Sequence, residues 1–96
     1  MAEKSEDSTI YIGGKPFMNY VTAVVMQFTT QGATNVIIKS RGKFISRAVD
    51  VAEVVKSRFM KDQVDLGEIK IDSEEFENKE GKKVRVSTLE ITLIKR

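Results

Sequence analysis

The chain has 96 residues, with 16 Lys and Arg against 14 Asp and Glu, and a formal net charge of +2. This length fits one domain with one hydrophobic core. The sequence contains no Cys and no His, which excludes disulfides, thiolate chemistry, zinc sites built from these residues and His-based acid–base triads, and we expect no metal and no cofactor.

The charges are segregated along the chain. Residues 8–49 contain no Asp or Glu, whereas residues 50–81 contain ten acidic and five basic residues. Residues 82–96 contain five basic residues and one acidic residue. Such asymmetry allows one strongly basic face on a molecule whose total charge is close to neutral. It indicates a partner that binds through its negative charge.

The chain begins with the polar segment MAEKSEDST, which lacks the apolar region of a signal peptide. No apolar run approaches the roughly 20 residues that a membrane span needs. We therefore expect an intracellular, cytoplasmic protein in which residues 1–8 are a disordered leader and residues 9–96 form a single domain.

The first predicted elements are a short strand and a helix. Residues 9–12 (TIYI) are rich in β-forming residues, and a Gly-Gly pair stops them. Pro16 suits the first position of a helix, and apolar residues then recur at helical spacing from residue 17 to residue 28, until Gly32 ends the pattern. Because many of these residues are β-branched, we expect the helix to depend on packing against a sheet.

A second strand and helix follow, and then two more strands. Residues 35–40 (NVIIKS) predict a buried strand, and apolar residues three and four apart predict a helix over residues 45–59. The remaining apolar pattern predicts two strands joined by a hairpin with its tip at residues 80–81. We expect a slip near Gly67 in the first of these strands and a bulge at residues 87–88 in the second.

The order β-α-β-α-β-β predicts an α+β two-layer sandwich, with two helices on one face of a four-stranded mixed sheet. A right-handed crossover makes the first two strands parallel, so their carboxyl ends lie at the edge where both helices begin. Helix N-termini attract anions. Basic residues in the two loops at this edge would therefore add to a site for phosphate.

The segment IKSRGKFISRAV (residues 38–49) carries Lys39, Arg41, Lys43 and Arg47 and no acidic residue. Together with Lys15 in the first loop, this pattern favours binding of a polyanion. The alternative is a solvent-exposed start of a helix that carries ordinary surface lysines. Arg41 stands out because its planar guanidinium can hold a phosphate with two hydrogen bonds. The GGKP turn is not a nucleotide-binding P-loop, since Pro follows the Lys where Ser or Thr is needed.

Two side chains near the first loop have more than one interpretation. Asn19 and Tyr20 lie on the first turn of the first predicted helix, beside Lys15. Tyr20 is either a core or rim residue, or a ring that stacks on a sugar or an unpaired base.

Phe59 also has two interpretations, because it either packs in its own core or forms an exposed apolar contact with another subunit. The acidic pair Glu74–Glu75 lies in a charged hairpin with no apolar pocket to raise a carboxyl pKa. We therefore expect that the protein is not an enzyme.

Four segments resemble the Alba family of archaeal chromatin proteins: IGGKPFMNYV, VIIKSRGKFISRAVD, VVKSRF and RVSTLEI. The resemblance extends from about residue 10 to residue 95. It implies a homodimer of a β-α-β-α-β-β domain that binds double-stranded DNA, and also RNA, with little sequence preference, and that coats and compacts DNA in the nucleoid. It also implies that the hairpin arms embrace the minor groove, and that Arg58 and Phe59 mediate contact between dimers along DNA.

The resemblance also implies which side chains contact nucleic acid. The typical family turn has two lysines before the proline, the first of them reversibly acetylated; here Gly14 takes that position, and Lys15 is the remaining candidate for acetylation. The arm segment EEFENKEGKK is more acidic than in relatives that bind tightly, which predicts weaker or more salt-sensitive binding. The implied nucleic-acid-binding residues are Lys15, Asn19, Tyr20, Arg41, Lys43, Arg47, Lys82, Lys83 and Arg85.

Two other functions remain open from the sequence. The chain could act mainly on RNA, as an RNA-binding protein, an RNA chaperone or a ribonucleoprotein subunit, if Tyr20 stacks on unpaired bases. It could instead be a protein-interaction domain that uses the acidic hairpin and Phe59.

Overall fold

The computed structural model describes residues 7–96. In that range the chain forms four strands, two α-helices and two short helical turns. These are β1 (Asp7–Tyr11), α1 (Phe17–Thr29), β2 (Asn35–Arg41), η1 (Gly42–Phe44), α2 (Ile45–Val54), η2 (Val55–Phe59), β3 (Val64–Glu77) and β4 (Lys83–Lys95). The turn η1 is 3₁₀-helical, and η2 is a π-helical turn that continues α2.

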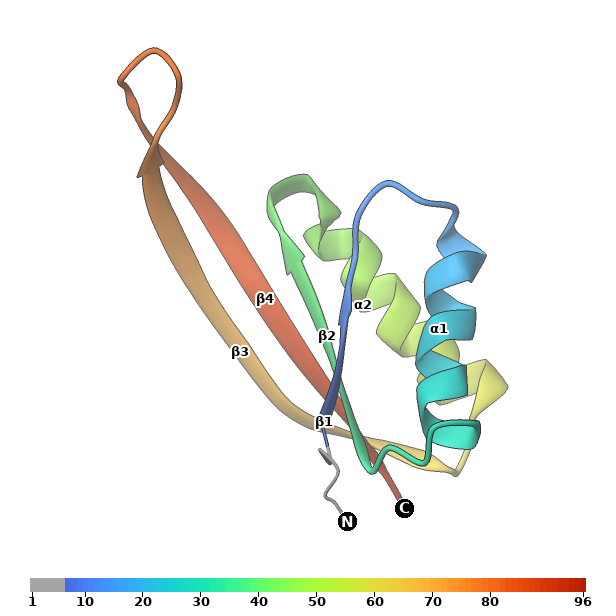
Figure 1. Ribbon diagram of the computed structural model, residues 1–96. Helices are drawn as coiled ribbons and strands as arrows, with labels where there is room; N and C mark the ends of the chain where they lie inside the picture. Colours follow the sequence, from blue (N-terminus) through green and yellow to red (C-terminus); the bar gives the residue numbers. More distant parts are fainter. Residues whose placement is uncertain (1–6) are drawn as a thin grey trace.

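The four strands form one mixed sheet in the order β1-β2-β4-β3. β1 and β2 are parallel, whereas β2 with β4 and β3 with β4 are antiparallel. Both helices cover the same face of this sheet (Figure 1). The α+β sandwich expected from the sequence is therefore confirmed.

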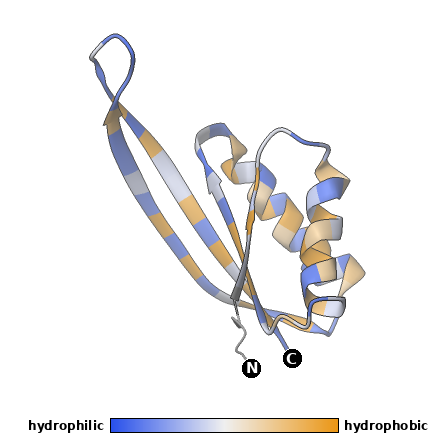
Figure 2. Ribbon diagram, in the orientation of Figure 1, coloured by the Kyte–Doolittle hydropathy of each residue, from blue (hydrophilic) through white to orange (hydrophobic). Residues whose placement is uncertain are grey.

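The core lies between this sheet face and the helices. In β2, residues 36, 38 and 40 are buried and alternate with residues that are only partly buried, as expected for a strand with one face toward a core. α1 buries Tyr20, Val21, Val24 and Phe28, which lie on one side of the helix. Figure 2 shows the corresponding alternation of apolar and polar residues along the strands.

β3 and β4 continue beyond the sheet as a two-stranded arm. The last pair between β2 and β4 is Arg41 with Thr88, so residues 73–87 form the part that β2 no longer supports, here called the arm. The arm ends in a turn in which the N–H of Gly81 donates to the carbonyl oxygen of Asn78, and Gly81 has a φ of 80° that favours glycine. The arm contributes to the elongated shape of the molecule, with extents of 46 × 31 × 22 Å (Figure 1).

Most predicted element boundaries agree with the structure, and three details differ. The register slip near Gly67 is confirmed between Leu66 and Ile69, but the expected bulge at residues 87–88 is wrong, because both residues pair in continuous register with β3. The second predicted helix changes from α to π geometry after Val54. Of the expected leader, residues 1–6 lie outside the described residues, while residues 7 and 8 pair with β2 in β1.

Candidate nucleic-acid interface

The loops that follow β1 and β2 lie at one edge of the molecule, because these strands are parallel. The β1–α1 loop carries Lys15, and η1 carries Lys43, and both side chains are exposed. Neither α1 nor α2 has an acidic residue in its first turn or a side-chain cap at its N-terminus. The N-terminal ends of two helices and two lysines therefore meet at this edge, here called the loop edge, and both attract anions.

Tyr20 holds the β1–α1 loop in place. Its side chain is 8% exposed, and its hydroxyl oxygen accepts hydrogen bonds of 3.0 Å from the backbone N–H groups of Gly13 and Lys15. Because the ring is buried in the core, it is not open to stacking on a base. Of the two interpretations of Tyr20, the structure supports the core residue. The spacing of Tyr20, Val24 and Phe28, four residues apart, is the sequence signal for this placement.

Arg47, in the first turn of α2, connects the two loops of this edge. Its Nη2 donates a hydrogen bond of 2.9 Å to the carbonyl oxygen of Lys15, and its guanidinium carbon lies 6.0 Å from the centre of the Tyr20 ring. Its Nε is buried and has no hydrogen-bond partner among the described residues. The charge of Arg47 therefore lies directly beneath the Lys15 loop, and the side chain is fixed by its contacts.

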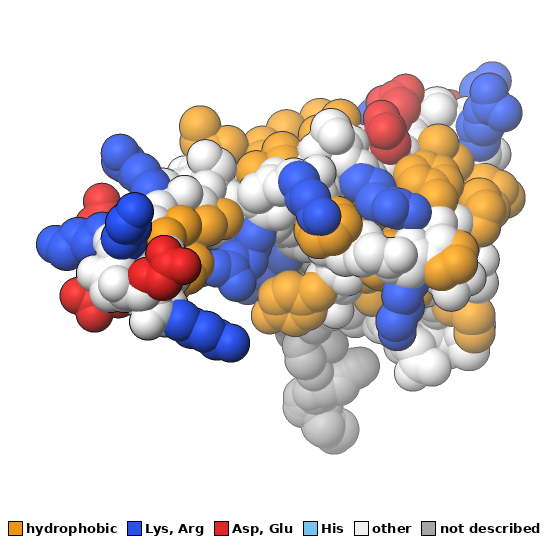
Figure 3. Space-filling view, turned by 90° about the horizontal axis from the view of Figure 1, so that it is seen from above, with side chains coloured by type: hydrophobic (Ala, Val, Ile, Leu, Met, Phe, Trp, Pro, Cys, Tyr) orange, Lys and Arg blue, Asp and Glu red, His pale blue; other side chains and the backbone are white. Residues whose placement is uncertain are grey.

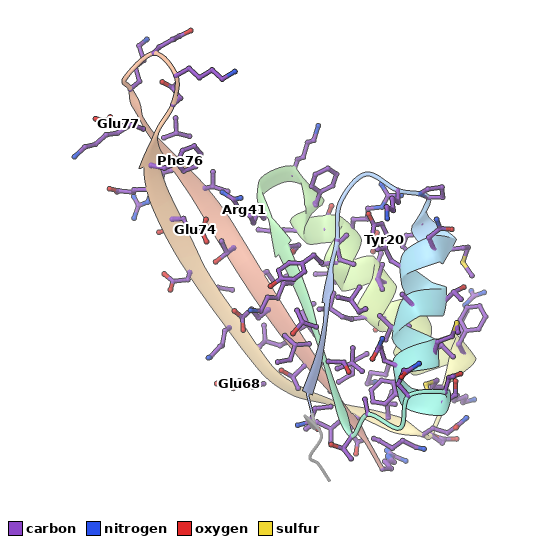
Figure 4. The ribbon with its side chains drawn as sticks, viewed as in Figure 1. Tyr20, Arg41, Glu68, Glu74, Phe76 and Glu77 are labelled. Atoms are coloured by element: carbon purple, nitrogen blue, oxygen red, sulfur yellow. The ribbon has the colours of Figure 1, made fainter. Side chains whose placement is uncertain are left out.

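Arg41 lies at the end of β2 and contacts the arm. Its Nη2 is 3.1 Å from Oε1 of Glu74, and its guanidinium carbon is 5.9 Å from the centre of the Phe76 ring. Figure 4 shows Arg41 reaching from β2 toward these two residues of β3. A phosphate that binds Arg41 must therefore compete with a carboxylate.

Lys39 is also paired, since its Nζ lies 3.6 Å from Oε2 of Glu90. The absence of acidic residues from the segment 38–49 predicts uncompensated positive charge, and this prediction is wrong for Lys39 and Arg41. The acidic partners belong to β4 and β3, which are distant in sequence and are brought close by sheet pairing. For Lys15, Lys43 and Arg47, no ion pair is present among residues 7–96.

The other implied contact residues are distributed over the molecule. Asn19 is exposed on the first turn of α1, next to the loop edge. On the arm, Lys83 lies opposite Glu77 and Arg85 lies opposite Glu75, so each base has an acidic cross-strand neighbour. Lys82 lies in the turn of the arm and is exposed. Figure 3, which looks down on the molecule, shows Lys and Arg interleaved with Asp and Glu on the arm.

Arg58 and Phe59 lie in η2, at the C-terminal end of α2 and so away from the loop edge. Both are exposed, and half of the surface of Phe59 is accessible to solvent (50%). Of the two interpretations of Phe59, burial in its own core is therefore wrong. No three side chains of His, Cys, Asp or Glu in residues 7–96 are placed to hold a metal ion, and no helix in that range is long and apolar enough to cross a membrane.

The comparison with known proteins assigns the family. The family model named Alba matches residues 8–73. The DNA/RNA-binding protein Alba of Nanoarchaeum equitans is 60% identical over 88 residues, which cover 91% of this chain and 97% of that protein. The DNA/RNA-binding protein Alba of Methanocella arvoryzae is 52% identical, with 92% and 90% covered. The solved structure of Alba from Thermoplasma volcanium has a TM-score of 0.81 and 46% identity, and the match covers 91% of this chain and 99% of that chain. This chain therefore belongs to the Alba family.

Proposed function

We propose that this protein binds double-stranded DNA, and also RNA, with little sequence preference, and that it coats and compacts DNA as a homodimer in the nucleoid. The names of its relatives describe DNA/RNA-binding proteins. As a member of this family the chain is not an enzyme, in agreement with the expectation from its sequence.

The observation that carries the proposal is the loop edge itself. Lys15, Lys43 and Arg47 gather there at the N-termini of two helices, and no carboxylate among residues 7–96 forms an ion pair with them. Such an edge binds phosphates of the backbone, which position a protein on a duplex without reading its sequence. Exposed Asn19 adds a neutral hydrogen-bonding group beside it. Exposed Lys15 would also be accessible to acetylation, which removes its charge.

The homodimer is supported by an exposed apolar strip on the helix side of the sheet. Three of its residues line a groove between α2 and β3, and the whole strip is open to solvent in the single chain. Apolar surface of this kind marks an interface. In a two-fold dimer the same strip on each protomer would be covered by the other, and each loop edge would occur twice. The strip consists of Val49 (47% exposed), Leu66 (48%), Ile69 (51%) and Ile71 (80%).

In this proposal Phe59 joins one dimer to the next along the DNA, and the bases of the arms contact the minor groove. The acidic neighbours on the arm weaken this second contact. The loop edge is therefore the main source of affinity.

The test is a salt titration of binding to two unrelated blunt duplexes, measured by fluorescence anisotropy. Lys15, Lys43 and Arg47 give about six phosphate contacts per dimer, or about eight if Arg41 leaves Glu74, so we expect a log–log slope of about −5 to −7. The two duplexes should give the same slope and similar affinities. A slope near zero would exclude the phosphate model.

Lys15→Ala should weaken binding to both duplexes equally and make the slope shallower by about 2, because each dimer loses two contacts. Lys95→Ala is the matched control, since Lys95 is an exposed lysine at the far end of β4. Equal effects of the two substitutions would contradict a role for the loop edge. Competition between duplex DNA and a structured RNA then decides which of the two is preferred, and preference for RNA would favour a role as an RNA-binding protein.

A further inference from the structure

A second surface with nucleic-acid chemistry lies on the face of the sheet opposite the helices. A groove of about 550 Å³ runs there between β1, β2 and the base of the arm. Its walls include Tyr11, Lys39, Arg41, Lys43, Thr88 and Glu90. These residues belong to four separate elements, so the groove is a product of the fold and has no continuous sequence motif.

Tyr11 is the unusual member of this groove. Its side chain is 69% exposed although it lies at the end of a strand in the sheet. Ile10, on the other face of the same strand, packs against the core. The ring of Tyr11 is thus presented to solvent, whereas that of Tyr20 is buried and contacts the backbone of its own loop.

A cation lies beside this open ring. Nζ of Lys39 is 5.8 Å from the centre of the Tyr11 ring and 3.6 Å from Oε2 of Glu90. An exposed aromatic ring next to a lysine is suited to a nucleotide, because the base stacks on the ring and its phosphate reaches the ammonium group. Thr88 and Glu90 supply a hydroxyl and a carboxylate for hydrogen bonds with the edge of the base.

We propose that this groove binds unpaired nucleotides of a single-stranded nucleic acid, with one base stacked on Tyr11. Its phosphates displace Glu90 from Lys39 and Glu74 from Arg41, and both carboxylates line the same groove. The inference rests on the proposed function, because both concern nucleic acid: the loop edge is the first binding surface and the groove is the second. A paired base cannot enter, because its faces are covered by its neighbours in the duplex. The groove meets the loop edge at Lys43, so a strand that leaves a duplex bound there continues onto the sheet face.

The experiment compares binding of three probes by fluorescence anisotropy: a blunt DNA duplex, an oligouridine strand and an oligodeoxythymidine strand of equal length. Tyr11→Val removes the ring but keeps a strong β-former in the strand. It should weaken binding of the single strands by about five- to one-hundred-fold, in line with the stacking of one base on an aromatic side chain. Binding of the blunt duplex should change by less than about two-fold, since the duplex contacts the loop edge.

Two further variants act as controls. Tyr11→Phe keeps the ring and should retain binding of the single strands. Thr9→Val changes an exposed residue two positions earlier on the same face of β1 and should leave all three affinities unchanged. Photocrosslinking of a 5-iodouridine strand, followed by mass spectrometry, should identify Tyr11 as a crosslinked residue.

The results separate this inference from the proposed function. If wild-type protein binds the duplex with the expected salt slope and Tyr11→Val leaves single-strand binding intact, the groove proposal is wrong and the loop edge stands. Equal loss of duplex and single-strand binding in Tyr11→Val would also overturn it. If the duplex fails to bind while the single strands depend on Tyr11, the groove proposal holds and the duplex proposal fails. A preference between the two single strands shows whether RNA or DNA is the better ligand.

Discussion

At Arg41, phosphate binding competes with an ion pair to Glu74. Its guanidinium group lies 3.1 Å from a carboxylate oxygen of Glu74, and both side chains remain 57% exposed. An exposed ion pair of this kind contributes little to folding, about 0.2–1 kcal/mol. It nevertheless neutralises a cation at the margin of the loop edge. The arm therefore reduces the positive charge that a phosphate meets.

Removing this carboxylate should strengthen binding. We expect Glu74→Gln to raise the affinity for a blunt duplex several-fold at low salt and to steepen the log–log salt slope by about 2 per dimer, because two arginines become free for phosphate. The measurement is the same anisotropy titration as for the wild-type protein.

Glu75→Gln is the control for this change. Glu75 is the next residue of β3, its side chain points to the other face of the strand, and its cross-strand partner is Arg85. The substitution removes the same charge without touching Arg41, so its effect should be smaller. If both variants strengthen binding equally, net charge and not the Arg41 contact controls affinity.

At the scale of single elements, β3 depends on the absence of a side chain at Gly67. A Cβ there would lie 2.7 Å from Cδ1 of Ile94 and 3.2 Å from the backbone oxygen of Thr92. The position falls within the register shift between Leu66 and Ile69, where β3 departs from regular pairing. Close approach of β4 therefore explains why glycine occupies this site.

Gly67→Ala should lower the free energy of unfolding by about 1–3 kcal/mol, since the added methyl group forces Ile94 and β4 to move. Chemical denaturation monitored by circular dichroism measures this change. Ile94→Val removes the nearest atom and should restore part of the loss when combined with Gly67→Ala. Gly14→Ala is the control, because no atom lies within 4 Å of a Cβ at that position. Equal destabilisation at both glycines would contradict a steric cause.

The elements themselves were predictable, whereas their contacts across the sheet were not. Hydrophobic periodicity predicted both helices and the last two strands because it reports which face of each element is buried, and β-forming or apolar runs predicted the first two strands. The pairing of Arg41 with Glu74 joins residues that are far apart in sequence, and it depends on strand order and register. Tyr11 gave no sequence signal for a groove, because its neighbours there come from other strands. The placement of Tyr20 was accessible from its spacing to Val24 and Phe28.

At the scale of the whole molecule, the apolar strip is the surface that the single chain leaves uncovered. Val49 lies on α2, and the other members of the strip, Leu66, Ile69 and Ile71, lie on β3. The proposed dimer covers the strip and brings two loop edges onto one ligand. In this proposal, affinity for a duplex would depend on dimer formation as well as on charge.

Val49→Glu should convert the dimer to a monomer, because each interface would then bury two unpaired carboxylates. Analytical ultracentrifugation measures the mass, and anisotropy should show a large loss of duplex affinity together with a shallower salt slope. Met26→Glu is the matched control, since Met26 lies on α1 and is also 47% exposed. A dimeric Val49→Glu variant, or a wild-type protein that is monomeric, would exclude this interface.

The strand order also constrains how the chain folds during synthesis. β4 is the last strand in chain order, yet it lies between β2 and β3 in the sheet. Until β4 has been made, one side of β2 has no neighbour, and the helices cover an incomplete surface. Such long-range pairing slows folding and leaves strand edges open in the nascent chain. If translation paused before β4, the nascent chain would be an aggregation-prone intermediate. Chaperones would be most useful to this protein at that stage.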